Sequence, residues 1–437
     1  MTMQIPVHVW LPGQVDAVRA GDFVHEPNQR SGRFLYAQSY LDARHPPLAP
    51  DMPLRAKPIL VTGGLAIFPL FMDAGPDAWG RHLLARRQER DISEIEALTL
   101  CPTDGVGNIA LGELTPERLR VVSINEFLSI VEEVGAGETA TTLVEEQVLD
   151  AVRNGTSLGG TKPKLTLSRA GVQYLAKFPE PGDNPWLPHI ECAMLKLAAA
   201  CGLRVSRAEV WRLPGGKRTA LLVERFDRRT LVTGVTRLGY VSAHAVLRLD
   251  LMPPSPAETL QFGTLGYTAS GLRKSYVSLA AAMARWCGGQ ALHREERREL
   301  WRRIVFNALI RNLDDHTKNH GLLCDDMATQ RWRLAPAFDL VPGANAGEQA
   351  ALAMAYRFVP PQRKGRQSSA SRLVTRISQV DLLAAAVEHY GYAEQEATDY
   401  LRDITAQVSE KWRRFMVEEG MPQEEIERQA RAFMIAL

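Results

Sequence analysis

The chain has 437 residues, of which 45% are hydrophobic and 23% charged, with 52 Lys and Arg against 50 Asp and Glu. This length exceeds a single small core and predicts two or three domains. The net charge of +2 gives no case for a broad nucleic-acid-binding or membrane-binding surface. The five cysteines form no C-x-x-C pair, so neither a disulfide framework nor a zinc site is indicated.

The N-terminal residues predict neither a signal peptide nor a membrane segment. Residues 1–13 lack a basic stretch followed by an apolar one, which a signal peptide requires. The longest apolar run, residues 59–72, is interrupted by Gly63, Gly64 and Pro69 and is too short to span a bilayer. We therefore expect a cytoplasmic protein that does not contact the membrane.

The first part of the chain predicts a small α/β domain. Alternating apolar residues indicate short strands, one of them at residues 33–38. Residues 73–90 begin with a turn sequence and continue as a helix whose apolar face carries Trp79, Leu83 and Leu84.

A glycine-rich segment, NGTSLGGTKPK, follows at residues 154–164. Glycines allow backbone N–H groups to approach phosphate closely, so Ser157, Gly159, Gly160 and Lys164 are candidate nucleotide contacts. The segment does not match G-x-x-x-x-G-K-[ST] and is therefore not a Walker loop. By itself such a segment is more often an ordinary loop.

A strand at residues 172–177 comes next and ends at Lys177. The ammonium group of such a lysine pairs with ATP phosphates and with a helix glutamate in kinases. Glu191, near the start of a helix predicted at residues 190–201, is the candidate partner. The alternative is a lysine that extends along apolar neighbours to the surface.

Two more strands and then a helical region complete the pattern. The strands are expected at residues 207–212 and 219–226, so this part of the chain forms a mixed sheet backed by one helix. After about residue 255, apolar residues recur at i, i+3 and i+4. We expect helices at residues 272–286, 295–312, 380–390 and 396–417.

The stretch between the second and third of these helices carries the groups that phosphoryl transfer needs. Asp314 and Asn319 have the spacing of the base and the metal-binding Asn of protein kinases, and Asp339 follows twenty residues later. We assign Asp314 as the base, with Asn319 and Asp339 as Mg²⁺ ligands. Asp315 is followed five residues later by His320, a poor Mg²⁺ ligand, so Asp315 is expected to be a solvated or capping group.

These assignments have structural alternatives. The segment from Asp314 to Asn319 resembles a polar turn in which Asp and Asn cap their own backbone. Asp339 lies among apolar neighbours, where an ionised carboxylate needs a partner such as a metal, but it could instead cap a helix or turn. Lys318 is a candidate phosphate contact or an exposed loop lysine.

Taken together, these pieces resemble the HipA family of bacterial serine/threonine kinases, the toxins of HipA–HipB toxin–antitoxin modules. The resemblance covers nearly the whole chain. It rests on residues 76–81, 104–108, 157–164, 177–179, 223–228, 314–319 and 338–339.

The resemblance implies an α+β fold with a protein-kinase-like bilobal arrangement, a mixed-sheet N-lobe and an all-α C-lobe. The expected parts are an N-terminal α/β subdomain at 1–145, the N-lobe at 146–255 and the helical C-lobe at 256–437. It implies the cofactors ATP and Mg²⁺, with Lys177 holding ATP and the strand that carries Glu224 and Phe226 leading into the adenine hinge. Ser157 matches the family's regulatory serine, whose autophosphorylation silences the enzyme.

The resemblance also implies partners. Family members phosphorylate proteins, notably glutamyl-tRNA synthetase and in some cases other aminoacyl-tRNA synthetases. They bind a small HipB-like helix-turn-helix antitoxin, so contact with DNA would be indirect. Two alternatives remain: a small-molecule or phosphoinositide-like kinase, and a non-catalytic corepressor that only binds an antitoxin. The complete set of Lys177, Asp314, Asn319 and Asp339 argues against the corepressor.

Overall fold

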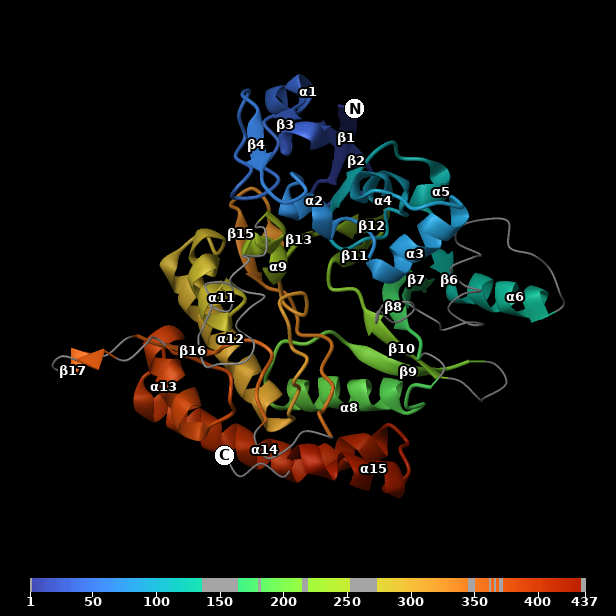
Figure 1. Ribbon diagram of the computed structural model, residues 1–437. Coiled ribbons are helices and arrows are strands. Elements are labelled where there is room, and N and C mark those ends of the chain that lie inside the picture. The colour runs from blue at the N-terminus through green and yellow to red at the C-terminus, as the bar shows by residue number, and fades with distance from the viewer. Residues whose placement is uncertain are drawn as a thin grey trace. The chain divides into compact units, whose positions relative to one another are not determined.

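The chain folds into two compact units. The computed structural model describes residues 2–135, 164–179, 182–213, 219–251, 273–344, 350–360, 363–364, 367–368 and 372–433. One unit comprises Met1–Cys192 and Ser206–Tyr240, and the other comprises Ala193–Val205 and Val241–Leu437. The chain passes between the units within helix α8 (Leu187–Ala200), after residue 205 and within strand β13 (Gly239–Ser242) (Figure 1).

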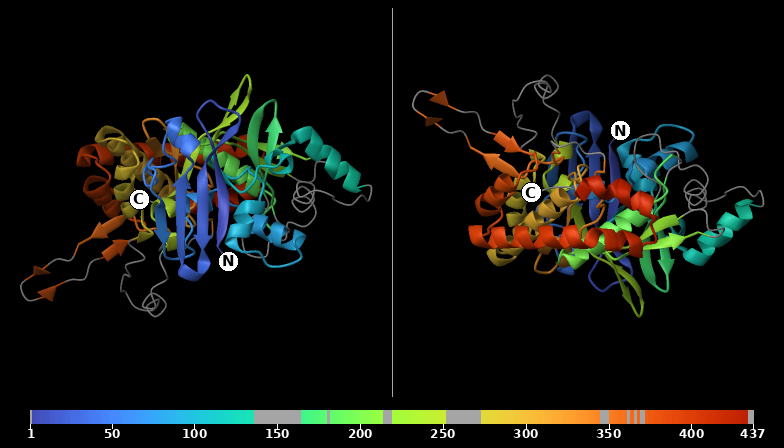
Figure 2. Two further views of the ribbon diagram at one scale, coloured as in Figure 1. Left: turned by 90° about the horizontal axis from the view of Figure 1, so that it is seen from above. Right: turned by 90° about the horizontal axis from the view of Figure 1, so that it is seen from below.

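An antiparallel sheet with the order β4-β3-β2-β1-β5 begins the first unit (Figure 2). Its strands are β1 (Met3–Trp10), β2 (Ala17–Glu26), β3 (Ser31–Tyr36), β4 (Ile59–Thr62) and β5 (Ile109–Leu111). Ile5, Val7 and Val9 of β1 are buried, because alternate residues of a strand point to one face. Ile5 lies opposite Phe23 of β2, whose ring packs edge-on against Phe71 at 5.5 Å. The core of this sheet therefore combines aliphatic and aromatic side chains.

Five short helices accompany the sheet: α1 (Gln38–Asp42), α2 (Pro69–Asp73), α3 (Ala78–Arg87), α4 (Glu94–Leu100) and α5 (Pro116–Leu119). The helix predicted after the turn sequence that begins at residue 73 is α3, and α2 precedes that turn. Asp77 ends the turn between them, because its carboxylate accepts a hydrogen bond from Gly80 N at 2.8 Å and caps α3. Trp79, Leu83 and Leu84 are buried on α3, as their spacing predicted.

A second, mixed sheet follows in the first unit, with the order β6-β7-β8-β10-β9. Its strands are β6 (Val122–Ser123), β7 (Lys164–Arg169), β8 (Val172–Lys177), β9 (Ala208–Arg212) and β10 (Thr219–Glu224), of which β6 and β7 are parallel. Leu222 packs with Phe127 of α6 (Ile124–Gly135) on one face. Leu221 and Val223 pack against Cys192 of α8 on the other. The mixed sheet predicted for this part of the chain is confirmed, but helices cover both of its faces, where we expected one helix.

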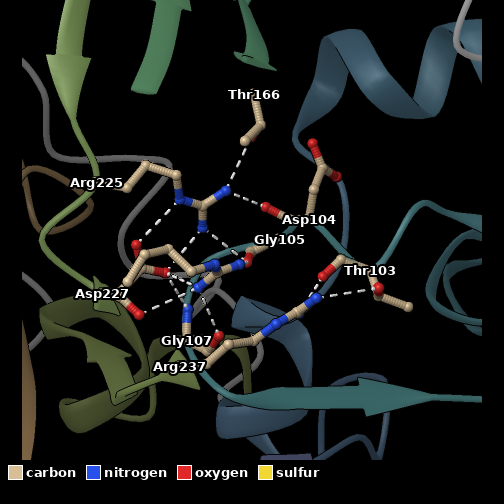
Figure 3. Close-up of polar contacts among 9 residues, drawn as sticks. Thr103, Asp104, Gly105, Gly107, Thr166, Arg225, Asp227 and Arg237 are labelled. Carbon is tan, nitrogen blue, oxygen red and sulfur yellow. Dashed lines mark hydrogen bonds and ion pairs between the residues drawn. The ribbon is translucent and has the colours of Figure 1, made fainter. Parts of the chain in front are cut away.

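A loop at residues 103–107 joins the two sheets of the first unit (Figure 3). Arg225 and Arg228 donate hydrogen bonds to carbonyl oxygens of this loop and to the carboxylate of Asp227. Gly107 N donates to the same carboxylate at 2.7 Å. The two arginines and Asp227 are buried, so the segment that follows β10 is fixed to the loop that precedes β5. The hairpin β11 (Arg228–Leu231) and β12 (Gly234–Arg237) follows directly.

The second unit is mainly helical. Its longer helices are α11 (Tyr276–Ala282), α12 (Gln290–Leu309), α13 (Gln379–His389), α14 (Glu394–Glu418) and α15 (Gln423–Gln429), and α9 (Ala243–Val246) is a single turn. Fully buried Trp301 of α12 donates to the carbonyl oxygen of Leu382 in α13 at 3.0 Å. No helix in the described ranges is long and apolar enough to cross a membrane.

The helical region also contains strands that we did not predict. They are β14 (Gly321–Asp326), β15 (Arg331–Leu334), β16 (Arg357–Val359), β17 (Arg363–Lys364), β18 (Gln367–Ser368) and β19 (Arg372–Val374). In the β14–β15 hairpin, buried Leu322 and Cys324 lie opposite buried Leu334 and Trp332. The unpredicted strands span only two to six residues, too few for alternation to stand out between long helices.

Candidate active site

The predicted base lies on a loop of the second unit that follows helix α12. The helix ends at Leu309, and Arg311 adopts a left-handed conformation, with φ of 52°, that turns the chain. Exposure then alternates along the loop: Asp314, His316 and Lys318 are exposed, whereas the residues between them are buried. The Asp314 side chain therefore points outward, as a group that accepts a proton from a substrate must. Lys318 lies on the same exposed side.

Asp315 is buried, so our expectation of a solvated or capping group was wrong. The residue is only 2% exposed. Its Oδ2 atom accepts hydrogen bonds from Asn307 Nδ2 at 2.6 Å and from the hydroxyl of Tyr276, and His320 Nε2 lies 2.8 Å away. These three groups replace the water that a buried carboxylate loses. Motif spacing did not reveal this role, because Tyr276 is far from Asp315 in the sequence.

Tyr276 keeps its proton in this cluster. Burial is the larger cause that raises the pKa of Tyr276 well above its ordinary value, and the neighbouring Asp315 carboxylate raises it further. The hydroxyl is therefore a donor at every pH at which the protein would work. His320, which we considered only as a poor metal ligand, is likewise buried and packs edge-on against the Tyr276 ring at 5.5 Å.

Asn319 is held by the loop that it follows. Its Nδ2 atom donates to the carbonyl oxygen of Asp314 at 3.3 Å, and its backbone N–H donates to that of His316 at 2.9 Å. The residue is 8% exposed. With its nitrogen directed to the loop, the amide oxygen is the atom suited to bind a cation.

Asp339 adopts the left-handed conformation, with φ of 61°. Aspartate tolerates this region better than most residues, although the conformation is uncommon for any residue but glycine. Its backbone carbonyl accepts a hydrogen bond from Asn312 Nδ2 at 3.4 Å, and the next residue, Leu340, is buried. Asp339 is partly exposed and lies in the segment that follows β15.

The chemistry of Asn319 and Asp339 fits Mg²⁺. This ion prefers oxygen ligands and is bound in nucleotide enzymes by one or two carboxylates or amides together with phosphate oxygens and water. Within the described residues no group of three or more His, Cys, Asp and Glu could hold a metal by itself. A site of one amide and one carboxylate does not require such a group, because ATP would complete it.

Helix α9 holds the other end of the loop that carries Asp314. Ala243 N donates to the carbonyl oxygen of His320 at 2.8 Å, and His244 N donates to that of Thr317 at 3.1 Å. His244 Nδ1 also lies 3.1 Å from Thr317 Oγ1, while its Nε2 lies 2.9 Å from Asp250. Burial would raise the pKa of Asp250, but the contact with His244 lowers it below the ordinary value. We did not predict these contacts.

The predicted lysine and glutamate meet in the first unit. Lys177 at the end of β8 places its Nζ atom 2.6 Å from Oε1 of Glu191 in the first turns of α8. Their side chains are 19% and 7% exposed, respectively, so water screens the attraction poorly. The expected contact is present, whereas contact with ATP stays a prediction.

Of the other predicted nucleotide contacts, Lys164 and Glu224 lie on the same mixed sheet, whereas Phe226 follows strand β10, which ends two residues earlier than predicted. Lys164 begins β7 opposite Lys177 and forms an ion pair with Asp77 at 2.6 Å. Glu224 ends β10, and the ring of Phe226 lies 5.7 Å from that of Tyr240. Ser157, Gly159 and Gly160 lie outside the described residues. Lys164, Lys177, Glu191, Glu224 and Phe226 thus belong to the first unit, and Asp314, Lys318, Asn319 and Asp339 belong to the second.

Comparison with known proteins finds a family match for the N-terminal part and for the C-terminal part of the chain. Residues 8–112 match the family model of the HipA N-terminal domain, and residues 156–412 match that of the HipA-like C-terminal domain. A curated relative, "Putative kinase Y4mE" of Sinorhizobium fredii, is 24% identical over 371 residues, which is 78% of each chain.

Two solved structures are also similar. The first is HipA from the Shewanella oneidensis MR-1 toxin–antitoxin complex of HipA, HipB and operator DNA, with a TM-score of 0.64 and 18% identity over 98% of this chain and 96% of that one. It shows that the fold is shared, and with it the kinase-like architecture. The second, the Helicobacter pylori proinflammatory kinase CtkA, covers 65% of this chain and 96% of its own at 14% identity. Its TM-score of 0.34 is too low to show a shared fold.

Proposed function

The chain belongs to the HipA family, and from this we propose that it is a protein kinase that uses ATP and Mg²⁺ to phosphorylate serine or threonine. The observation that carries the proposal is the loop after α12. It exposes the Asp314 carboxylate and holds the Asn319 amide against the Asp314 backbone. A base and a metal ligand in this arrangement suit phosphoryl transfer, in which the protein mainly positions groups and stabilises charge.

In the first unit, Lys177 supplies a positive charge for the phosphates of ATP. Glu191 orients the ammonium group through the 2.6 Å ion pair. Glu224 ends strand β10 and Phe226 follows that strand; both would contact the adenine. Lys164 and the segment with Ser157, Gly159 and Gly160 would cover the phosphates.

In the second unit, Asp314 accepts the proton of the substrate hydroxyl. The hydroxyl oxygen then forms a bond to the γ-phosphorus, the bond from that phosphorus to the bridging oxygen breaks, and ADP leaves. Asn319 and Asp339 would hold Mg²⁺, which supplies positive charge to the phosphate oxygens. Lys318 extends from the exposed side of the loop and would add a further positive charge.

The finer parts of the proposal concern partners and regulation. We propose a growth-inhibiting toxin that a HipB-like antitoxin binds, because the Shewanella HipA of the same fold is found with HipB and its operator DNA. An aminoacyl-tRNA synthetase, such as the glutamyl enzyme, is the protein substrate suggested by the family resemblance. Phosphorylation of Ser157 would place nearly two negative charges beside a segment suited to ATP phosphates and so inhibit the enzyme.

Mass spectrometry after incubation of the purified protein with Mg²⁺ and ATP tests the activity. The wild type should gain a phosphoryl group at Ser157, whereas Asp314→Gln and Asp339→Asn should gain none. Asp399→Asn, which removes a carboxylate that is 42% exposed on α14, should be labelled as the wild type is. Equal labelling of all four proteins would overturn the assignment of the site.

A further inference from the structure

A chain of buried polar side chains connects the loop of Asp314 to Asp339 within the second unit. Asp315 accepts a hydrogen bond from Asn307 Nδ2 at 2.6 Å. The Oδ1 atom of Asn307 accepts one from Asn312 Nδ2 at 3.2 Å, and this nitrogen also lies 3.4 Å from the carbonyl oxygen of Asp339. We call Asp315, Asn307 and Asn312 the buried relay.

Each member of the buried relay is almost fully enclosed. Asn307 is 1% exposed, Asp315 2% and Asn312 3%. A carboxylate and two amides at such depth are costly unless their hydrogen bonds are made, and a partly satisfied network is less stable than an apolar core. The folded state therefore favours one arrangement of the three side chains. That arrangement fixes the two segments at its ends.

The two ends of the buried relay lie next to segments to which the proposed function assigns the base and the metal ligands. Asp315 is the neighbour of Asp314 in the chain, so inward anchoring of one directs the other outward. At the opposite end, the relay holds the backbone of Asp339, whose left-handed conformation needs support from its surroundings. The relay thus reaches both predicted metal-binding segments without contacting substrate.

We propose that Asp315, Asn307 and Asn312 are positioning residues that keep the loop of Asp314 and Asn319 in a fixed arrangement with Asp339. The catalytic meaning of this coupling rests on the proposed kinase function. The coupling itself is a property of the fold and can be measured without any activity. Groups behind metal ligands typically change metal affinity or activity by about 10-fold or more when they are removed.

Tyr276→Phe tests the buried relay at its Asp315 end. The change removes one donor to Asp315 and leaves the ring in place. Tyr356→Phe is the matched control, because Tyr356 is equally buried in this unit and its hydroxyl donates to the carbonyl oxygen of Arg376 at 2.6 Å. Each variant removes one hydrogen bond made by the hydroxyl of a fully buried tyrosine, so general destabilisation should be similar in the two.

Hydrogen–deuterium exchange of the full-length chain gives the decisive readout. Tyr276→Phe and Asn312→Ala should each accelerate exchange about 10-fold both at residues 315–320 and at residues 337–341. The control should leave both segments as in the wild type. Faster exchange in only one segment, or the same pattern in Tyr356→Phe, would show that the buried relay does not couple them.

Kinetics then show whether the coupling serves the proposed function. In Tyr276→Phe the Mg²⁺ concentration for half-maximal activity should rise about 10-fold, with a lower kcat and an unchanged KM for ATP at saturating Mg²⁺. An unchanged Mg²⁺ requirement, together with coupled exchange, would refute the catalytic meaning of the relay. A wild type without Mg²⁺-dependent phosphoryl transfer would refute the proposed function instead, while the exchange data would still judge the coupling.

Discussion

Lys177 Nζ lies 2.6 Å from Glu191 Oε1, and both side chains are largely enclosed between strand β8 and helix α8. The pair joins a strand end to the first turns of the next helix, fourteen residues later. Because the attraction acts with little screening by water, each charge holds the other in place. The orientation of α8 at this point is thereby linked to the position of the lysine ammonium group.

If Lys177 binds the phosphates of ATP, loss of either partner should impair catalysis. We expect Glu191→Gln and Lys177→Met each to lower kcat/KM for ATP about 100-fold, a loss comparable to removal of one preorganised group that stabilises charge. The double variant should be little worse than either single one, because the two side chains act as a unit. Steady-state kinetics over a range of ATP concentrations measure this.

A second Lys–Glu pair provides the control. Lys196 and Glu419 are 2.5 Å apart, and the glutamate is again 7% exposed. Glu419→Gln should therefore cause a comparable loss of stability without the loss of kcat/KM. Equal kinetic effects of Glu191→Gln and Glu419→Gln would argue that the Lys177 pair serves stability alone.

Asp314 and Asp339 should differ in their response to Mg²⁺. Removal of a general base slows the chemical step by about 10²–10⁴-fold, so Asp314→Asn should lower kcat and leave the Mg²⁺ requirement unchanged. Asp339→Asn removes a metal ligand, so part of its lost activity should return as Mg²⁺ is raised. Initial rates as a function of Mg²⁺ concentration separate the two roles. Recovery of Asp314→Asn by Mg²⁺ would contradict the assignment.

The fold was predictable where the information was local. Periodic apolar residues located the helices at 295–312, 380–390 and 396–417 to within a few residues of α12, α13 and α14. The strand–helix order placed Lys177 near Glu191 for the same reason. The predicted roles of these residues, and of Ser157, stay predictions.

Long-range polar contacts could not be predicted in the same way. Asp315 differs from its neighbour Asp314 only by facing inward, and its partner Tyr276 is 39 residues away. The carbonyl groups that surround Arg225 come from a loop about 120 residues earlier. Every residue has a backbone carbonyl group, so residue types in the sequence do not indicate which of these groups will surround an arginine.

Asp227 should make the stability of the chain depend on pH. Burial would raise the pKa of this carboxyl, but Arg225 and Arg228 hold it below the ordinary range. A lowered folded pKa stabilises the fold above the unfolded value of about 3.9, and the stabilisation is lost as pH falls below it. Asp227→Asn leaves two buried arginines without their carboxylate and should lower the free energy of unfolding by about 3–5 kcal/mol at pH 7.

Urea unfolding of both proteins between pH 7 and pH 2.5 measures this effect. The gap in unfolding free energy between wild type and Asp227→Asn should be constant above about pH 5 and should narrow below about pH 4. Asp399→Asn, which alters an exposed carboxylate, should show a small gap throughout. A gap that widens on acidification would contradict the lowered pKa of Asp227.

The close approach of the loop at residues 103–107 can be tested through Gly105. A Cβ atom at this position would lie 2.7 Å from the carbonyl oxygen of Ala74, so Gly105→Ala must displace the loop. Because Gly105 also offers its carbonyl to Arg225 and Arg228, we expect a loss of about 2 kcal/mol or more. At Gly289 a Cβ atom would meet nothing within 4 Å, so Gly289→Ala should cost less than about 1 kcal/mol.

The same loop predicts an interaction between two substitutions. Arg225→Lys removes the planar group that donates to Asp104, Gly105 and Asp227 together, which a single ammonium cannot reproduce. Once the loop has been displaced by Gly105→Ala, those bonds are already weakened, so the combined loss of unfolding free energy should fall short of the sum by about 1 kcal/mol. Thermal and urea unfolding of the two single variants and the double variant measure this shortfall. Full additivity would mean that Arg225 stabilises the mixed sheet without the help of the loop.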